Sequence, residues 1–464
     1  MTDFDLAING GLIINSEGRT RANVGVRGGR IAVMSEAPLQ ARRTIDASNR
    51  WVLPGVIDPH VHFALKQGQG DGAIMTEDDY QNGPVAAAIG GVTMFIDFAI
   101  APRTRPPEEF LRERIALADA GSCIDYSFHA GITDPDPAVL ERFGHIIEMG
   151  IPSFKFFVTY RKWGFAVDLG FLLDAFQTIH GLNGVACIHA EQDEILEYLR
   201  TRYASQPDLI YHSRTRPDFS EEIAVYEVVT LARETGARLY VVHLTAGKAL
   251  AVIRQAQAAG LPVRTETCPH YLAFTDEIYR EPKGVLYTMT PPLRPPGNRE
   301  ALWEGLADGT ISAVSSDHNA FGREVKERRP HWLEVPPGIA GSEMILTYLH
   351  SEGVAKGRIT AERMVGLISA GPAALFGVPR KGAIRVGYDA DLVLFDPHAV
   401  RVVHHEDLAT PVGYTIFEGM EMRGWPTHTI SRGEVIVENR KFVGSTGRGR
   451  FIERQIDPAP AWQG

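Results

Sequence analysis

The sequence has few cysteines, no long apolar run and no excess of basic residues. Only Cys123, Cys187 and Cys268 occur in 464 residues, and none belongs to a C-x-x-C pair. This excludes a disulfide-stapled scaffold and a cysteine zinc ribbon, and it favours a reducing compartment. No stretch approaches the roughly 18 uninterrupted apolar residues of a membrane-spanning helix, and the first residues do not resemble a signal peptide. We therefore expect a cytoplasmic protein with no membrane partner.

The charge balance is mildly acidic, with 47 basic against 57 acidic residues and a formal net charge of −10. Nucleic acid is not an expected partner, because phosphate binding needs a clustered basic surface. One arginine-rich stretch, GREVKERRP at 322–330, is expected to be a solvated loop. The composition, 44% hydrophobic and 22% charged, is otherwise that of an ordinary globular protein able to bury a large core.

The chain divides into three parts by pattern. Residues 1–53 alternate apolar and polar over short runs broken by glycine and asparagine, which predicts β-structure. Residues 54–377 repeat a strand followed by a helix, which predicts a distorted (β/α)8 barrel, although periodicity does not exclude a doubly wound open sheet. Residues 378–464 return to β-structure. Because chain termini often lie close together, we expect 1–53 and 378–464 to form one composite β-sandwich.

The strongest local motif is Asp58-Pro59-His60-Val61-His62, which follows the apolar strand WVLPGVI. Side chains alternate faces along a strand, so His60 and His62 point the same way and can share a metal ion such as zinc. An isolated H-x-H is more often a pair of surface or hydrogen-bonded histidines. At the carboxyl end of a barrel strand, however, this direction is the mouth where active sites are built.

Four more polar residues interrupt apolar runs, namely Lys155, His189, His243 and Asp317. Taken singly, a buried histidine is more often a satisfied core residue, an aspartate can cap a helix, and a lysine can extend to solvent. Lys155 lies among phenylalanines, where a charged amine is costly. All of these residues lie at the ends of different expected barrel strands, so a shared role is favoured.

Together these residues predict a centre of two divalent metal ions. His60 and His62 would bind one ion, and His189 and His243 the other. A neutral lysine amine can add carbon dioxide, so Lys155 as a carbamate (N6-carboxylysine) would bridge ions about 3.5 to 4 Å apart. Asp317 would bind the first ion beside a bridging hydroxide.

The sequence resembles the cyclic amidohydrolases of the amidohydrolase superfamily, in the hydantoinase and dihydropyrimidinase branch. The resemblance covers essentially the whole chain. Its motifs include GVIDPHVHF at 55–63, SFKFF at 153–157, CIHAE at 187–191, VVHLTAG at 241–247, TCPHYL at 267–272, MTPPLR at 289–294 and SSDHNAF at 315–321.

The resemblance implies an enzyme with two ions, usually zinc, that opens the ring amide of a cyclic ureide. The hydroxide between the ions would attack the ring carbonyl. Asp317 would carry its proton to the leaving nitrogen, and Tyr160 would donate to the developing oxyanion, unless it simply packs at the barrel rim. The backbone at Thr290 and the loop 335–341, including Pro337 and Gly338, would hold the substrate. A homotetramer or homodimer is implied.

Two departures from the branch affect substrate binding. Thr290 stands where serine is usual, and Pro337 stands where an asparagine usually precedes the loop glycine, which removes an amide side chain and an N–H group. Allantoinase and cyclic imide hydrolase therefore stay open as alternatives. Dihydroorotase is disfavoured because Ala64 replaces its arginine, and a non-catalytic relative is disfavoured because every ligand position is filled. Trp163 and Phe165 either line the pocket for the ring substituent or pack at its rim.

Overall fold

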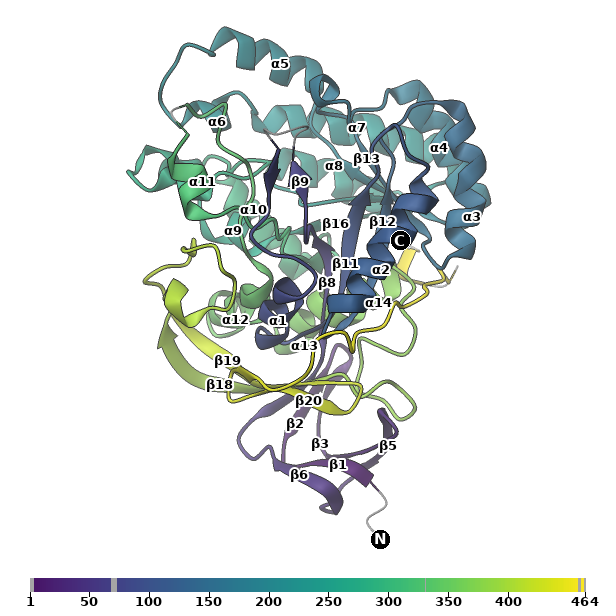
Figure 1. The fold of residues 1–464 in the computed structure, drawn as a ribbon, viewed down its shortest axis with the longest axis vertical. Helices are drawn as coiled ribbons and strands as arrows, with labels where there is room; N and C mark the ends of the chain where they lie inside the picture. Colours follow the sequence, from purple (N-terminus) through teal and green to yellow (C-terminus); the bar gives the residue numbers. More distant parts are fainter. Residues whose placement is uncertain (1–3, 68–72, 330, 458–459, 463–464) are drawn as a thin grey trace.

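The computed structural model describes residues 4–67, 73–329, 331–457 and 460–462. A barrel of strands and helices forms one part of the molecule, and β-sheets built from both ends of the chain form the other (Figure 1). The two chain ends therefore fold together, as the sequence pattern predicts.

Eight parallel strands make up the barrel, in the order β17-β16-β15-β14-β13-β12-β11-β8. The seam between β17 and β8 is bridged where His62 N donates to His318 O at 2.8 Å, beside a Val61–His318 bridge. The predicted (β/α)8 barrel is thus confirmed, in a distorted form. Its strands are β8 (Val56–Val61), β11 (Val92–Ile100), β12 (Asp125–Gly131), β13 (Ser153–Phe157), β14 (Val185–His189), β15 (Arg238–Val241), β16 (Val263–Thr267) and β17 (Ala313–Val314).

The helices of the chain follow the apolar periodicity of the sequence. Helix α4 begins after Asp168, whose carboxylate accepts from Phe171 N at 2.9 Å, and it buries Phe171, Ala175 and Ile179 on one face. The helices are α1 (Asn82–Ile89), α2 (Pro107–Gly121), α3 (Phe143–Glu148), α4 (Leu169–Gly181), α5 (Asp193–Arg202), α6 (Tyr211–Arg214), α7 (Asp218–Thr235), α8 (Gly247–Ala258), α9 (Pro269–Ala273), α10 (Asn298–Asp308), α11 (Arg323–Glu327), α12 (Ile345–Tyr348), α13 (Ala361–Val365) and α14 (Gly371–Leu375).

Two sheets face each other in the β-sandwich. One has the order β5-β4-β1-β6, and the other the order β21-β20-β19-β18-β7-β2-β3. In the second sheet β18 pairs with both β7 and β19, which joins the two ends of the chain. The strands are β1 (Phe4–Asn9), β2 (Leu12–Asn15), β3 (Gly18–Arg21), β4 (Asn23–Arg27), β5 (Arg30–Ser35), β6 (Ala41–Asp46), β7 (Trp51–Pro54), β18 (Leu392–Val402), β19 (Glu421–Ser431), β20 (Glu434–Glu438) and β21 (Lys441–Phe442).

The sandwich has its own apolar core, distinct from that of the barrel. Inward-facing residues of both chain ends fill it, among them Leu6, Ile13, Leu392 and Ile430. A separate hairpin of β9 (Lys66–Gln67) and β10 (Ile74–Met75) lies in the loop after β8. The composite sandwich is confirmed as part of the fold.

The stretch at 322–330 differs from its prediction as a solvated loop. Residues 323–327 form α11, and Lys326 is 0% exposed. Its ammonium donates to Thr288 O at 2.7 Å and to Thr288 Oγ1 at 3.1 Å, so chain acceptors replace water. The prediction is wrong for Lys326, because charge density in a sequence does not reveal a buried acceptor. Pro330 lies outside the described residues.

The structure bears on two features noted in the sequence, the cysteines and the lack of long apolar runs. Cys123, Cys187 and Cys268 are all buried and free of disulfide bonds. Across the described ranges, no helix is both long enough and apolar enough to span a membrane.

Candidate metal centre

His60 and His62 lie side by side at the carboxyl end of β8. Their Nε2 atoms are 3.2 Å apart. The carboxylate of Asp317, from the loop after β17, has Oδ1 at 3.1 Å from His60 Nε2 and 3.4 Å from His62 Nε2. The alternation of side chains along the strand thus brings both imidazoles to one carboxylate.

His189 and His243 complete a contiguous group of four imidazoles. His189 ends β14, and His243 follows β15 by two residues. Their ring centres are 4.5 Å apart, and that of His243 is 5.3 Å from that of His60. One ligand atom each from His60, His243 and Asp317 lies within 4.8 Å of the others.

Lys155 lies in the middle of β13 with 1% of its surface exposed. Its Nζ is 4.7 Å from the ring centre of Phe98 and 5.0 Å from that of Phe157. Burial lowers the pKa of this amine to about 8, which brings the neutral form within reach near physiological pH.

Burial also sets the protonation of the histidines. It lowers the pKa of His62 and His189 to about 4 and that of His243 well below its usual value, so these imidazoles are neutral and able to bind metal. For His60, burial is outweighed by the charges of Asp317 and Glu266, which raise the pKa to about 9. Asp317 and Glu266 therefore favour a positive charge at His60.

Two observations fit the group to a divalent cation. Among the described residues, His62 Nδ1 and His243 Nδ1 are buried nitrogens without a hydrogen-bond partner. His243 and Asp317 also adopt left-handed backbone conformations, with φ of 38° and 46°. Such strain in non-glycine residues concentrates at functional sites. A set of imidazoles and a carboxylate is the donor set that zinc and similar ions take.

Glu266 in β16 supports this group and was not singled out from the sequence. Its Oε1 lies 2.5 Å from His60 Nδ1 and accepts from His243 N at 3.2 Å, and its Oε2 accepts from Tyr240 OH at 2.9 Å. A charged residue inside the strand VRTET was the available signal, the same signal that marks Lys155.

Asp58, beneath the histidines, holds the loop that carries Asp317. Its carboxylate accepts from Ser316 N at 3.0 Å and from Ser342 Oγ at 3.0 Å. Asp58 therefore holds the loop after β17, which carries Asp317. Sequence spacing does not reveal such a contact, because 258 residues separate Asp58 from Ser316.

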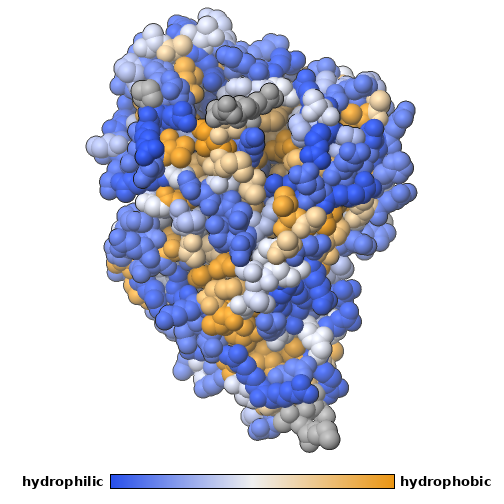
Figure 2. Space-filling view, viewed as in Figure 1, coloured by the Kyte–Doolittle hydropathy of each residue, from blue (hydrophilic) through white to orange (hydrophobic). Residues whose placement is uncertain are grey.

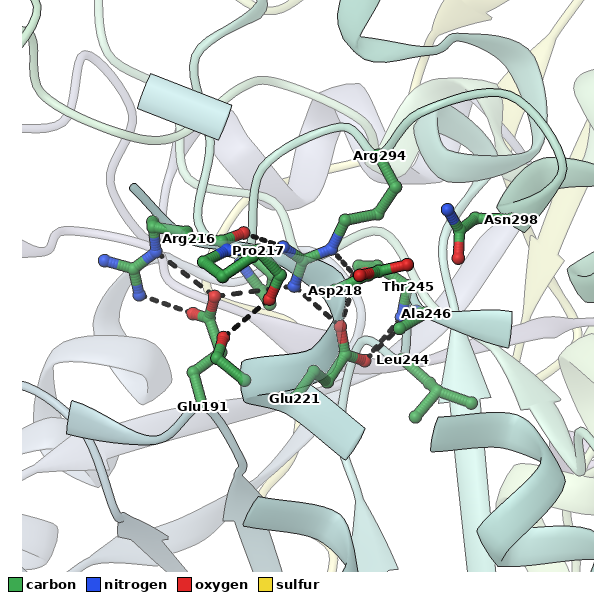
Figure 3. A network of polar contacts seen from close by, with 12 residues as sticks. Glu191, Arg216, Pro217, Asp218, Glu221, Leu244, Thr245, Ala246, Arg294 and Asn298 are labelled. Atoms are coloured by element: carbon green, nitrogen blue, oxygen red, sulfur yellow. Dashed lines mark hydrogen bonds and ion pairs between the residues drawn. The ribbon is translucent and has the colours of Figure 1, made fainter. Parts of the chain in front are cut away.

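Glu191, Arg216, Glu221 and Arg294 form a buried network of ion pairs (Figure 3). His189 Nε2 is 2.9 Å from Glu191 Oε2, and Glu191 pairs with Arg216 and, at 3.4 Å, with Arg294. Arg294 continues to Glu221 at 2.7 Å. The sequence motif CIHAE contains Glu191, but no role for it was predicted.

Tyr160 joins this network to the expected substrate-binding residues. Arg216 Nη2 donates to the Tyr160 hydroxyl at 3.2 Å, and the hydroxyl donates to Thr290 Oγ1 at 2.8 Å. Tyr160 has a left-handed backbone, with φ of 68°. Its ring centre is 5.1 Å from that of His189, so its hydroxyl and the metal centre belong to one site.

A cavity of about 1010 Å³ opens next to this group. Phe98 forms part of its wall, and its ring centre is 4.3 Å from that of His60, so the cavity lies next to the histidines with the Phe98 ring between them. Thr290 and Pro337 also line it. The N–H of Gly338 instead donates to Thr288 O at 3.0 Å, so that group is already engaged.

Comparisons with known proteins identify the family. Residues 51–436 match the amidohydrolase family. The chain is 35% identical to a D-hydantoinase of Geobacillus stearothermophilus over 96% of both chains, and 33% identical to a D-phenylhydantoinase of Escherichia coli over 97% of this chain and 98% of that one. A solved D-hydantoinase structure superposes with a TM-score of 0.94 at 33% identity, over 98% of this chain and 99% of that one. A dihydropyrimidinase from Brevibacillus agri gives a TM-score of 0.93, also at 33% identity over 98% and 99%.

The chain belongs to the amidohydrolase family. It is an enzyme of the cyclic amidohydrolase class, and the resemblance found in the sequence is confirmed.

Proposed function

We propose that this enzyme hydrolyses the ring amide of a cyclic ureide, in the manner of a hydantoinase or dihydropyrimidinase. The observation that carries the proposal is the convergence of four histidines, Asp317 and Lys155 at the carboxyl ends of the barrel strands, beside a large cavity. A cyclic imide stays the alternative substrate class, because Pro337 in the cavity wall lacks the amide side chain usual in the branch.

Two divalent cations, most simply zinc, would be held by His60, His62, His189, His243, Asp317 and Lys155 as its carbamate. The neutral imidazoles and the unpartnered nitrogens support this assignment. Lys155 has the lowered pKa that carbamate formation needs. When bound, such ions would polarise a carbonyl and lower the pKa of water to about 7.

Asp317 is the proposed proton carrier. Its carboxylate faces the histidines and is held ionised, since burial, which would raise its pKa, is outweighed by His60 and the other nearby imidazoles. It would accept a proton from the attacking water and deliver it to the ring nitrogen as the carbon–nitrogen bond breaks. Ring opening then gives a ureido acid.

Tyr160 is the proposed donor to the oxyanion. Its hydroxyl needs to turn from Thr290 Oγ1 to the substrate carbonyl, while Arg216 stays on its other side. Preorganised donors of this kind contribute about 10²- to 10³-fold to the rate. Thr290, Pro337 and Gly338 are the proposed substrate-binding positions, with Gly338 shaping the loop through the Thr288 contact.

The wider setting is part of the same proposal. The buried cysteines without disulfide bonds support a cytoplasmic location. A homotetramer or homodimer is the assembly that the resemblance found in the sequence implies. We place the sandwich domain at 1–53 and 378–464 and the catalytic barrel at 54–377, a boundary one residue before the end of β7 at Pro54.

The test is hydrolysis of a substrate panel by zinc-reconstituted protein, with metal content measured on the same sample. The panel contains dihydrouracil, hydantoin, 5-substituted hydantoins, allantoin, dihydroorotate and a cyclic imide. Turnover of hydantoins or dihydrouracil is expected. Preference for the imide would favour the alternative, and no turnover with two ions bound would overturn the proposal.

A further inference from the structure

The cavity beside the metal centre is larger than an unsubstituted ring requires. Its volume, about 1010 Å³, lies at the upper end of the range of about 300 to 1,000 Å³ seen for ligand pockets. In the space-filling view, apolar side chains gather around a hollow in the barrel part of the molecule, and hydrophilic residues surround them (Figure 2). The space left beyond the ring is therefore available to a bulky ring substituent.

The inner walls of the cavity are apolar. Trp163 stacks on Tyr160 with ring centres 5.0 Å apart, and it stays 44% exposed. The Arg200 guanidinium lies 5.3 Å from the centre of the Trp163 ring. Other apolar side chains of the wall include Phe98, Phe110, Phe165, Trp332, Leu333 and Val335.

The outer part of the cavity carries uncompensated positive charge. Arg114 and Arg216 line it but are paired with Asp97 and Glu191. Within the described ranges, neither Arg103 nor Lys162 has a carboxylate at ion-pair distance. Two acidic residues also line the cavity, Glu113, which is engaged by Arg105 at 2.8 Å, and the exposed Glu334. Among the residues that the structure describes, Glu334 has no cation at ion-pair distance, but three unpaired cations of the lining, Arg103, Lys162 and Lys66, outnumber it.

Arg103 and Lys162 share one wall of the cavity. Arg103 donates to Thr133 O at 2.8 Å and to Ala166 O at 3.1 Å. Ala166 follows closely after η3 (Arg161–Trp163), the short helix that contains Lys162. These carbonyl acceptors orient the guanidinium of Arg103 but do not neutralise its charge. An apolar substituent packed here would desolvate these cations, whereas an anionic one would satisfy them.

We propose that this enzyme, on the basis of the function proposed above, prefers cyclic ureides whose ring substituent ends in a carboxylate. The apolar walls would hold the carbon part of the substituent, and Arg103 and Lys162 would bind its terminal carboxylate. Ring opening of such a substrate releases a ureido acid with two carboxylates.

A matched pair of substrates tests this preference. 5-(4-Carboxybenzyl)hydantoin and 5-(4-carbamoylbenzyl)hydantoin have the same size and differ in charge. The expected kcat/KM is about tenfold higher for the carboxylate at low ionic strength, which is the size of one charge-assisted contact. The preference is expected to shrink in added salt. A ratio of one or below, with both compounds hydrolysed, would overturn the substituent preference and leave the proposed function standing.

Variants of Arg103 and Lys162 test whether these two cations cause the preference for the carboxylate. Lys162→Gln and Arg103→Gln are each expected to lower the ratio about threefold, by loss of one partly exposed contact. Arg103→Lys keeps the charge and should keep most of the ratio, which separates charge from the structural bond to Ala166. Lys356→Gln, on an exposed lysine paired with Glu352, is the control and should leave the ratio unchanged. An unchanged ratio in both Gln variants would overturn the assignment. No turnover of these compounds, hydantoin or dihydrouracil would overturn the function proposal and this one with it.

Discussion

Two buried clusters of charged and polar side chains lie at opposite ends of the barrel strands. The cluster at the amino end of β12 joins barrel and sandwich through Lys381, whose Nζ lies 2.8 Å from Asp125 Oδ2 and also pairs with Asp391. Arg432 N donates to Asp391 Oδ1 at 2.7 Å, and Arg450 N to Asp125 Oδ1 at 3.0 Å. Both carboxylates are thus satisfied by the chain itself.

The cluster at the carboxyl ends is not closed in this way. In the described part of the chain, His62 Nδ1 and His243 Nδ1 have no hydrogen-bond partner. Left-handed backbone does not separate the two clusters, because Arg432 of the first has φ of 45°, close to the 38° and 46° of His243 and Asp317. Both clusters bury charge, so burial alone does not distinguish them. The pairing of the ligand atoms does distinguish them. In the closed cluster, around Lys381, both carboxylates are paired with cations of the chain, whereas the open cluster, around the four histidines, leaves ring nitrogens free to bind a ligand.

The largest expected effect comes from Lys155→Ala. Removing the bridging group should abolish binding of two metals and lower kcat/KM by about 10⁴-fold or more. The metal-free variant should unfold at a temperature at or above that of the metal-free parent, because a buried amine is lost. Metal analysis, kinetics and calorimetry check this. Two metals retained with near-normal turnover would overturn the carbamate assignment.

The closed cluster should respond in the opposite way. Lys381→Met leaves Asp391 buried without its cation, while Arg432 still pairs with Asp125, so the free energy of unfolding should fall by about 3 to 5 kcal/mol. Denaturant titration measures it, and kcat of the folded fraction should be unchanged. A marked loss of kcat with an unchanged free energy of unfolding would contradict the assignment of Lys381 to the fold.

The sequence predicted the open cluster better than the closed one for a physical reason. Histidines and a lysine stand out in apolar strands, and strand alternation fixes where His60 and His62 point. Lys381 lies in a loop, where a charged residue is unremarkable, and its partner Asp125 lies 256 residues away in the barrel. Lys326 was mispredicted for the same reason, since its acceptors at Thr288 are backbone and hydroxyl groups that no pattern reveals.

Within the open cluster, Asp317→Asn separates proton transfer from metal binding. The amide keeps the shape of the side chain but accepts no proton, so kcat should fall by about 10²- to 10³-fold. Metal content should stay substantially bound, because the other ligands remain. An unchanged kcat would remove Asp317 from the proton-carrying role, and loss of metal would make it chiefly a ligand.

The smallest effect is expected for Glu266→Gln, which tests whether Glu266 serves the metal centre or the fold. Glu266 is bonded like the carboxylates of the closed cluster, yet it contacts His60 and His243 of the open one. Glu266→Gln keeps an acceptor for His60 Nδ1 but removes the charge that favours binding of a cation. Metal affinity should therefore fall by about 10- to 100-fold, as for other partners of metal-bound histidines.

The measurement is competition with a chelator, followed by kinetics at saturating metal, where kcat should recover. Glu227→Gln, which alters a carboxylate of α7 that accepts from Gln192, is the matched control and should change neither quantity. If Glu266→Gln instead lowered the free energy of unfolding of the metal-free protein by as much as Lys381→Met, Glu266 would belong to the fold. A loss confined to metal affinity places it with the site, because only the cation then depends on its charge.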